Sequence, residues 1–412
     1  MHILINRDQL LHELEILATF SEAPSPAITR IVFSEADRRA RSYVKDLCSR
    51  AGLELRDDAV GNTFARWPGE LPGESAVGTG SHIDAIPNAG RYDGTVGVLG
   101  GLEAIRALQR AGFRPRRSIE LLIFAAEEPT RFGIGCLGSR LLSGSLGASS
   151  GEQLKDKTGK TLNERRAEAG LHGDLTEVRL QPGYYAGFLE LHIEQGPLLE
   201  RDQMPLGIVT AIAAPASLRI VIEGEGGHAG GMLMPDRHDA LCAAAELILA
   251  VEAAALSSGA VDTVATTGVC EVFPGAVNSV PSRVRLEVDV RDTELDRRER
   301  VLAAITQAGT AIAARRRVSI HSETVNADAP ARCDEKIVES LARACSSSGL
   351  GFERMVSRAY HDSLFISRVA PVGMLFIPCR GGASHRPDEY ASPEAIANGT
   401  LVLAQALAEL AG

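Results

Sequence analysis

Three residues that can bind metal ions lie within one short stretch, SHIDAIPNAGRYDG, over residues 81–94. His82 and Asp84 are two positions apart after a predicted strand, so their side chains face the same way. One of the two side chains could bind a cation, while the other hydrogen-bonds to that side chain and fixes its orientation. Asp93 follows a glycine turn and opens a predicted helix, where backbone N–H groups favour an anion. The stretch indicates either a metal site or a capping aspartate beside a surface histidine.

Two adjacent acids, Glu127 and Glu128, close the apolar run SIELLIFAAEE. The run predicts a buried strand, and open α/β sheets bind ligands at the carboxyl ends of their strands. Because adjacent strand residues point to opposite sides, we expect the pair to differ in role. One would bind metal and the other would carry protons. The alternative is a hydrated strand end, which so apolar a run disfavours.

Two further histidines stand at predicted strand-to-loop boundaries, His192 in ELHIEQGP and His385 in RGGASHRPDEY. A lone histidine is more often a packed or surface residue than a ligand. Here, however, histidines and acids recur at the same kind of place. Imidazole and carboxylate ligands without thiolate suit zinc, manganese or cobalt. The number of candidate ligands suits two metal ions bridged by a carboxylate.

The elements that must position these residues alternate between helix and strand. Helical spacing is found at residues 35–52, 95–112, 334–348 and 393–411. Apolar strands lie between them, notably SAVGTGSH, SIELLIFAAEE, YAGFLELHIEQG and VGMLFIPC. This alternation predicts an α/β fold with a largely parallel sheet and helices packed on it.

The pattern changes near residue 211, where alternating strands such as SLRIVIEGEGGHAGG and PSRVRLEVDVRD begin. Predicted helices at about 236–257 and 294–315 lie between these strands. We interpret this part as an inserted αβ domain. The predicted domains are therefore a catalytic one at 1–210 and 328–412 and an inserted one at 211–327.

Composition narrows the classes of protein. The formal net charge of the 412-residue chain is −10, the wrong sign for a general nucleic-acid binder. No apolar run is long enough to cross a bilayer, and the N-terminal stretch reads as an amphipathic helix and not as a signal peptide. The seven cysteines are scattered without a C-x-x-C motif, which is typical of free thiols in a reducing compartment. We expect a cytoplasmic protein that binds neither nucleic acid nor membrane.

Several motifs together point to one family. They are DAVGNTFAR, GSHIDAIPNAGRYDGTVGVLGGLEAI, EEPTRFG, GSR, LHIEQGPLLE, GHAG, PGAVNSVPS, DVRD, YHDS and GGASHRPDE. Over nearly its whole length the chain resembles the ureido-cleaving branch of the binuclear metallopeptidase-like amidohydrolases. That branch includes N-carbamoyl-L-amino-acid hydrolases, allantoate amidohydrolases and ureidoglycolate amidohydrolases. The resemblance implies a metallopeptidase-like catalytic domain with a central, mostly parallel sheet, and an inserted αβ sandwich that serves as lid and dimerisation domain.

The resemblance also implies a role for each candidate ligand. Two divalent ions, Mn²⁺ or Zn²⁺, would share Asp93. His82 and His192 would complete the coordination of one ion, and Glu128 and His385 would complete that of the other.

Two acids beside these ligands would have other tasks. Glu127 would take a proton from the attacking water and pass it to the leaving nitrogen. Asp84 would support His82.

Further residues resemble the family's substrate-binding set. They are Gln195, His228, Asn278, Arg291, Tyr360 and His361. The resemblance implies a homodimer formed through the inserted domain, in which His228 reaches across to polarise the substrate carbonyl. The alternatives are a solvent-exposed loop histidine for His228 and a strand-end salt bridge to Asp289 or Asp292 for Arg291.

Two departures from the common family pattern bear on the substrate. Residues 231–234 read GMLM where relatives carry a Thr-Thr-Pro-Met run, and SRAYHDSLF replaces the frequent GAGHDA. Tyr360 in place of a glycine would narrow the pocket and suit a small substrate. Both variants resemble ureidoglycolate amidohydrolases, whereas RGGASH is closer to the general carbamoylase form.

The expected activity is therefore hydrolysis of ureidoglycolate, a small ureido carboxylate, to glyoxylate, ammonia and carbon dioxide. N-carbamoyl-L-amino acids or allantoate are the alternative substrates. An aminoacylase or dipeptidase is disfavoured by the short interval between His82 and Asp93. A catalytically inactive binding protein is disfavoured because every expected ligand and Glu127 are present.

Overall fold

The computed structural model describes all 412 residues, which form two compact units. The first comprises Met1–Thr210, Cys333–Met355 and His361–Gly412, and the second comprises Ala211–Arg332 and Val356–Tyr360. Residues 328–332 and 356–360, which the sequence patterns placed in the first domain, thus belong to the second unit. Their contacts explain this, since Arg358 pairs with Asp262 and Arg332 pairs with Glu294.

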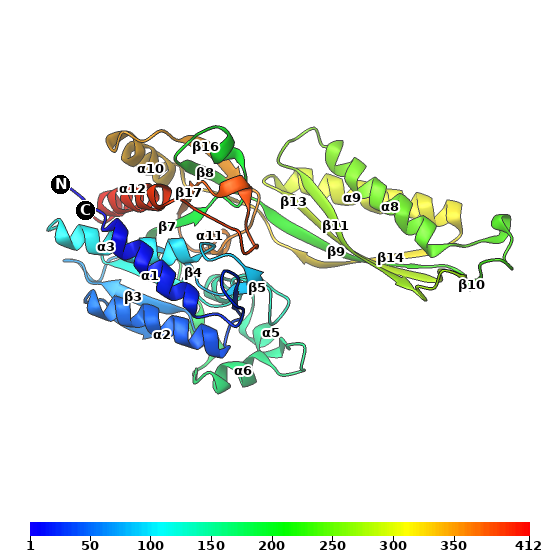
Figure 1. Ribbon diagram of the computed structural model, residues 1–412, viewed down its shortest axis with the longest axis horizontal. Helices are drawn as coiled ribbons and strands as arrows, with labels where there is room; N and C mark the ends of the chain where they lie inside the picture. Colours follow the sequence, from blue (N-terminus) through cyan, green and yellow to red (C-terminus); the bar gives the residue numbers. More distant parts are fainter. The chain divides into compact units, whose positions relative to one another are not determined.

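A mixed sheet forms the centre of the first unit (Figure 1). Its middle strands are parallel: β17 (Val372–Ile377), β7 (Tyr185–Ile193), β4 (Ala76–His82) and β6 (Ile119–Phe124). Antiparallel pairings flank them: β8 (Gly207–Ile212) pairs with β17, and β3 (Thr63–Trp67) pairs with β6 and with β2 (Glu54–Asp57). Strand β16 (Glu353–Ser357) pairs with β8 at the margin. The expected parallel sheet is therefore a parallel core with antiparallel margins.

Helices cover both faces of this sheet. One core cluster joins the sheet to α1 (Arg7–Thr19), α2 (Glu35–Arg50), α3 (Thr95–Arg110), α10 (Glu335–Ser347) and α12 (Pro393–Ala411). A second cluster, on the other face, includes α4 (Leu137–Ser143) and α11 (Asp362–Ile366). The predicted helices at 35–52, 95–112, 334–348 and 393–411 agree with α2, α3, α10 and α12 to within two residues at each end.

Short elements complete the first unit. They are β1 (Ile28–Arg30), which pairs with β5 (Ala85–Ala89), then α5 (Ala148–Gln153), α6 (Leu162–Glu168), α7 (Leu198–Arg201), η1 (Leu175–Val178) and η3 (Arg380–Gly382). Arg30 is fully buried and donates to the carbonyl oxygens of Leu17, Phe20 and Ile83. The last of these bonds fixes the backbone directly after β4.

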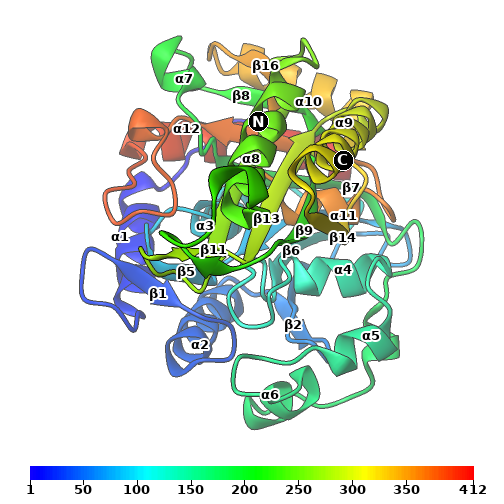
Figure 2. The ribbon, with the colours of Figure 1, turned by 90° about the vertical axis from the view of Figure 1, so that its right-hand side faces the viewer.

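The second unit is an antiparallel sheet with two long helices on one face (Figure 2). The strand order is β11 (Val264–Phe273), β13 (Arg283–Asp292), β9 (Ala214–Glu223) and β14 (Ser319–Ala327). The helices are α8 (Ala240–Leu256) and α9 (Leu295–Arg316), close to the predicted ranges. Smaller elements are β10 (Gly227–His228), its partner β12 (Ser279–Val280), η2 (Met234–Asp236) and β15 (Ala331–Arg332), which pairs with the end of β8.

The length and the charge of the helices determine whether any of them could cross a membrane. The longest, α9, has 22 residues and carries charged side chains at both ends. No helix of the chain combines the length and the apolar character that crossing a bilayer requires.

Candidate metal centre

The carboxyl ends of the parallel strands carry the predicted ligands, as the rule for open α/β sheets requires. His82 is the last residue of β4, and His192 is the second-last residue of β7. Glu128 follows β6 by four residues, and His385 follows η3 beyond β17. Asp93 lies between β5 and α3.

Asp93 stands between two groups of these ligands. Its Oδ1 is 3.4 Å from His82 Nε2 and 3.3 Å from His192 Nε2. Its Oδ2 is 3.4 Å from His385 Nε2, which in turn is 3.3 Å from Glu128 Oε1. In each group the potential ligand atoms lie within 4.8 Å of one another. The donors thus fit a pair of cations that share one carboxylate.

Charge and burial at the site agree with a bound cation. Asp93, Glu127 and Glu128 are all buried, and the ion pairs that they form are with imidazoles. Burial opposes ionisation of Asp93, but hydrogen bonds from His192 and His82 hold its pKa well below the usual range. So many desolvated carboxylates are costly unless they are paired or coordinate metal.

Gly94 shows how closely this loop approaches the site. Its φ is +67°, and an added Cβ would lie 2.4 Å from His82 Nε2. Only glycine accommodates both the left-handed backbone and this contact. The spacing of His82 and Asp93 therefore depends on a residue without a side chain.

Glu127 and Glu128 differ in orientation, although not for the reason the sequence suggested. Strand β6 ends at Phe124, and Ala126 has a φ of +54°, so neither glutamate is a strand residue. The turn at Ala126 directs Glu127 Oε2 to within 3.7 Å of His82 Nε2, while Glu128 faces His385. Burial raises the pKa of Glu127 well above its usual value, opposed by His82 and reinforced by Glu128. A carboxylate of this kind can accept a proton at neutral pH.

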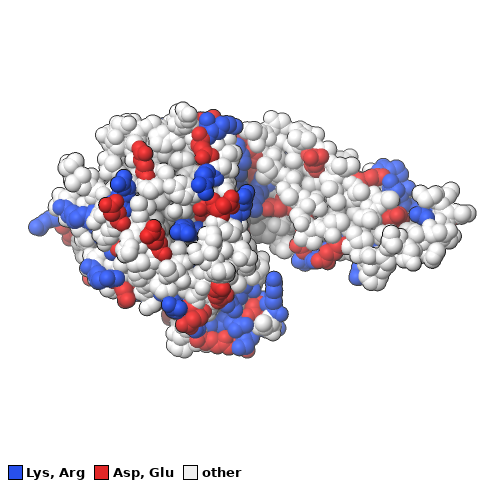
Figure 3. Space-filling model, in the orientation of Figure 1, with Lys and Arg blue, Asp and Glu red and all other residues white.

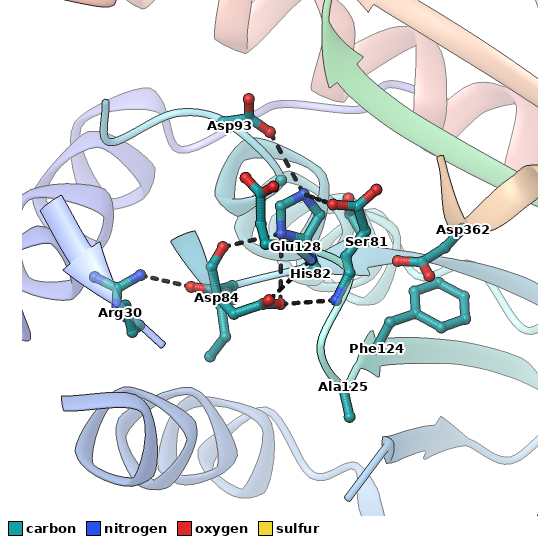
Figure 4. Close-up of polar contacts among 12 residues, drawn as sticks. Arg30, Ser81, His82, Asp84, Asp93, Phe124, Ala125, Glu128 and Asp362 are labelled. Atoms are coloured by element: carbon teal, nitrogen blue, oxygen red, sulfur yellow. Dashed lines mark hydrogen bonds and ion pairs between the residues drawn. The ribbon is translucent and has the colours of Figure 1, made fainter. Parts of the chain in front are cut away.

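Asp84 supports more of the site than the sequence suggested. Figure 4 shows His82 between Asp93 and Asp84. His82 Nδ1 lies 3.0 Å from the backbone oxygen of Asp84 and 3.7 Å from its carboxylate. The carboxylate instead accepts the backbone N–H groups of Glu127 at 3.2 Å and Glu128 at 3.0 Å. The expected support of His82 therefore comes chiefly from a carbonyl, because the carboxylate holds the turn after β6.

Gln195 and two residues that the sequence analysis missed surround Asp93. Gln195 Nε2 and Ser384 Oγ each donate to Asp93 Oδ2 at 2.6 Å. Gln195 Oε1 is buried without a partner, which leaves an acceptor for a ligand. Glu389 accepts the N–H of Asp93 at 3.1 Å, and burial, followed by the charge of Asp93, raises the pKa of Glu389 to about 7. Its place in SHRPDE, four residues after His385, was the available signal.

Glu190 is a further buried acid that the sequence analysis missed, whereas its neighbour His361 was predicted as a substrate binder. Glu190 accepts from Ser81 Oγ at 2.8 Å and Ser363 Oγ at 2.7 Å, and it is two residues before His192 on β7. His361 packs edge-on against His192, with ring centroids 4.5 Å apart. Strand alternation could have indicated Glu190, since it shares a face with His192.

Other predicted substrate binders belong to the second unit. His228 is exposed on β10, and the backbone of Asn278 accepts from Ala229 N–H at 2.9 Å. Arg291 forms the strand-end salt bridge considered as its alternative, with Asp289 Oδ2 at 2.8 Å, and its guanidinium lies 5.6 Å from the ring centre of Tyr360. Arg291 is therefore next to Tyr360 but is engaged by an acid.

The sequence of residues 78–409 matches the model of the family described as Peptidase family M20/M25/M40. The chain belongs to this family. The fold and the groups of histidines and carboxylates agree with its metal dependence.

Relatives place the chain among the amidohydrolases of the family. A protein of Arabidopsis thaliana named ureidoglycolate hydrolase is 51% identical over 408 residues, which cover 97% of this chain and 86% of the relative. An N-carbamoyl-L-amino acid amidohydrolase of Geobacillus stearothermophilus is 36% identical, with 99% of both chains covered. The crystal structure of AtUAH in complex with glyoxylate is 49% identical, with a TM-score of 0.90 over 99% of this chain and 98% of the other.

Replacement of Asp93 by alanine is expected to abolish tight binding of divalent metal, because Asp93 belongs to both ligand groups. Metal content after desalting and titration with Mn²⁺ will measure this. Asp174→Ala, which removes an exposed capping carboxylate, is the control and should bind metal as the wild type does. Undiminished metal binding by Asp93→Ala would show that these groups do not form the site.

Proposed function

We propose that this chain hydrolyses the ureido C–N bond of ureidoglycolate and releases ammonia. The observation that carries the proposal is the position of Asp93 between two ligand groups, with the Glu127 carboxylate beside His82. The relative from Arabidopsis supports the choice of substrate, since its 51% identity covers 97% of the chain. The carbamate left behind would lose carbon dioxide to give hydroxyglycine, which is unstable and would release a second ammonia to yield glyoxylate.

The metal centre we propose contains two divalent cations, Mn²⁺ or Zn²⁺. His82 and His192 would bind one, Glu128 and His385 the other, and Asp93 both. When bound, such cations polarise a carbonyl group and lower the pKa of water. Ligand chemistry does not separate the two metals, since imidazole and carboxylate accept both.

Glu127 would carry the proton in the reaction. As a carboxylate it takes a proton from the attacking water, while the oxygen forms a bond to the ureido carbon. It then returns this proton to the leaving nitrogen, so that the C–N bond breaks and ammonia departs. Its Oε1 accepts from Cys136 Sγ at 3.3 Å, which leaves Oε2 on the side of His82.

The predicted substrate binders would hold the substrate through their polar groups. Arg291 offers the forked guanidinium that matches a carboxylate, and it would exchange Asp289 for the substrate. Gln195 Oε1 is a free acceptor for a ureido N–H. Asn278, Tyr360 and His361 would complete the pocket.

We further propose a homodimer formed through the second unit. Helix α8 exposes Leu249 by 65% and Leu256 by 76%, beside the edge strand β11. In Figure 3 much of the second unit's surface around α8 carries no charged side chain. An open strand edge next to an apolar helix suits pairing with the same surface of a second copy. In such a dimer, His228 would polarise the carbonyl of substrate bound to the partner.

Ammonia release from three substrates will test the specificity. We expect kcat/KM for ureidoglycolate to exceed that for N-carbamoyl-L-amino acids and allantoate by about 100-fold, because a narrowed pocket rejects larger groups to this extent. If ureidoglycolate is the slowest of the three, the chain is one of the other ureido hydrolases. Release of amino acids from dipeptides would favour a peptidase.

The variant Glu127→Gln is expected to bind metal as the wild type does and to lose about 1,000-fold in kcat, because an amide cannot accept the proton. Metal content and ammonia release measure the two effects. Glu152→Gln, an exposed change in α5, should leave both unchanged. Full activity of Glu127→Gln would remove Glu127 from the mechanism.

Leu249→Glu is expected to convert the dimer to a monomer, because it places a charge in the apolar surface of α8. Light scattering during gel filtration gives the mass. Val325→Glu, at a 52% exposed position on the opposite edge strand β14, is the matched control and should remain dimeric. A wild-type monomer, or a dimeric Leu249→Glu, would contradict this interface.

A further inference from the structure

Glu389 is a buried carboxylate, 5% exposed, that has no part in the chemistry proposed above. Its Oε1 accepts the backbone N–H of Tyr92 at 2.7 Å and of Asp93 at 3.1 Å. Its Oε2 is 3.2 Å from Ser384 Oγ. All three contacts are to backbone or hydroxyl groups. A carboxylate desolvated for such contacts is costly, which indicates a task beyond general stability.

The contacts join two segments that lie 296 positions apart in the chain. One is the loop that ends at Asp93, and the other carries Ser384 and His385. The segments fit closely, since a Cβ added at Gly90 would lie 2.3 Å from the Cβ of Glu389. Ser384 adds a direct bond to Asp93 Oδ2, the oxygen that faces His385.

The two ligand groups differ in how they are supported. His82 and His192 lie on the buried strands β4 and β7. His385 lies on no strand or helix, has a φ of +58° and has a side chain that is 45% exposed. The group of Asp93, Glu128 and His385 therefore depends on loop-to-loop contacts, and Glu389 provides a buried one that joins two of its ligands.

We propose that Glu389 is a positioning residue that holds the Asp93 loop against the His385 segment and so forms the second metal-binding group. The inference rests on the proposed two-ion centre. Loss of Glu389 frees both segments. The group of His82, His192 and Asp93 keeps its two strand-borne ligands, whereas the group of Asp93, Glu128 and His385 loses the positioning of two of its three. The ion held by Asp93, Glu128 and His385 is then weakened selectively.

The test is titration of the chelator-stripped full-length protein with Mn²⁺. Glu389→Ala is expected to keep one tight equivalent and to bind the second about 10–100-fold more weakly, the usual effect of removing a residue behind metal ligands. Glu389→Gln keeps a carbonyl oxygen for the two N–H groups and should restore affinity close to that of the wild type. Ser384→Ala, which removes the bond to Asp93, should also weaken only the second ion.

Asp334→Ala is the matched control. Asp334 also accepts two backbone N–H groups, of Lys336 and Ile337, but at the start of α10. This variant should lower the melting temperature without changing the binding of either ion. Equal loss of the second ion in Asp334→Ala would show that general destabilisation, and not positioning, is responsible.

The remaining outcomes separate this inference from the proposed centre. A wild type that binds fewer than two ions overturns the centre itself. A wild type and a Glu389→Ala that both bind two ions with equal affinity overturn only the positioning role. If Glu389→Gln binds the second ion as weakly as Glu389→Ala does, the positioning role is also overturned. The charge of Glu389, and not the geometry of its hydrogen bonds, would then be what matters. If Glu389→Ala does not fold, the Mn²⁺ titration of Ser384→Ala provides the test. Unchanged binding of the second ion by Ser384→Ala would count against the proposal.

Discussion

The sharing of one carboxylate by two groups of ligands is the constraint around which the first unit is built. Asp93 must present Oδ1 to His82 and His192 and Oδ2 to His385 at the same time. A carboxylate on a free loop would rotate. Here Glu389 accepts the N–H of Asp93, and Gln195 and Ser384 donate to its Oδ2. Gly94, which follows it, has a left-handed backbone that lets the loop approach His82. The burial of these acids is unfavourable in free energy, and its structural effect is to fix the orientation of the Asp93 carboxylate.

Two carboxylates hold backbone turns near the site. Asp84 accepts the N–H groups of Glu127 and Glu128, and Glu389 accepts those of Tyr92 and Asp93. In each case a side chain from one segment holds two consecutive peptide groups of another. This device lets irregular turns be as well defined as strand ends, which catalytic positions require.

Much of this arrangement could be predicted from the sequence. Apolar runs located β4, β6, β7 and β17, and the rule that ligands gather at carboxyl strand ends brought His82, His192 and Glu128 together. What failed was local detail. The run IELLIFAA hides the end of β6 at Phe124, because the left-handed turn at Ala126 has no glycine to mark it. Glu389 and Ser384 were missed because their role arises from a contact between distant segments, which periodicity cannot show.

The separation in sequence between Asp93 and Glu389, 296 positions, has a consequence for synthesis of the protein. At ribosomal rates of about 5–20 residues per second, the Asp93 loop emerges roughly 15–60 seconds before the segment that clamps it. At the end of that interval His385 and Glu389 are the last of these residues to be translated, so the group of Asp93, Glu128 and His385 stays incomplete until then. The whole second unit is translated in the same interval. The two segments that Glu389 joins can therefore come together only late in translation.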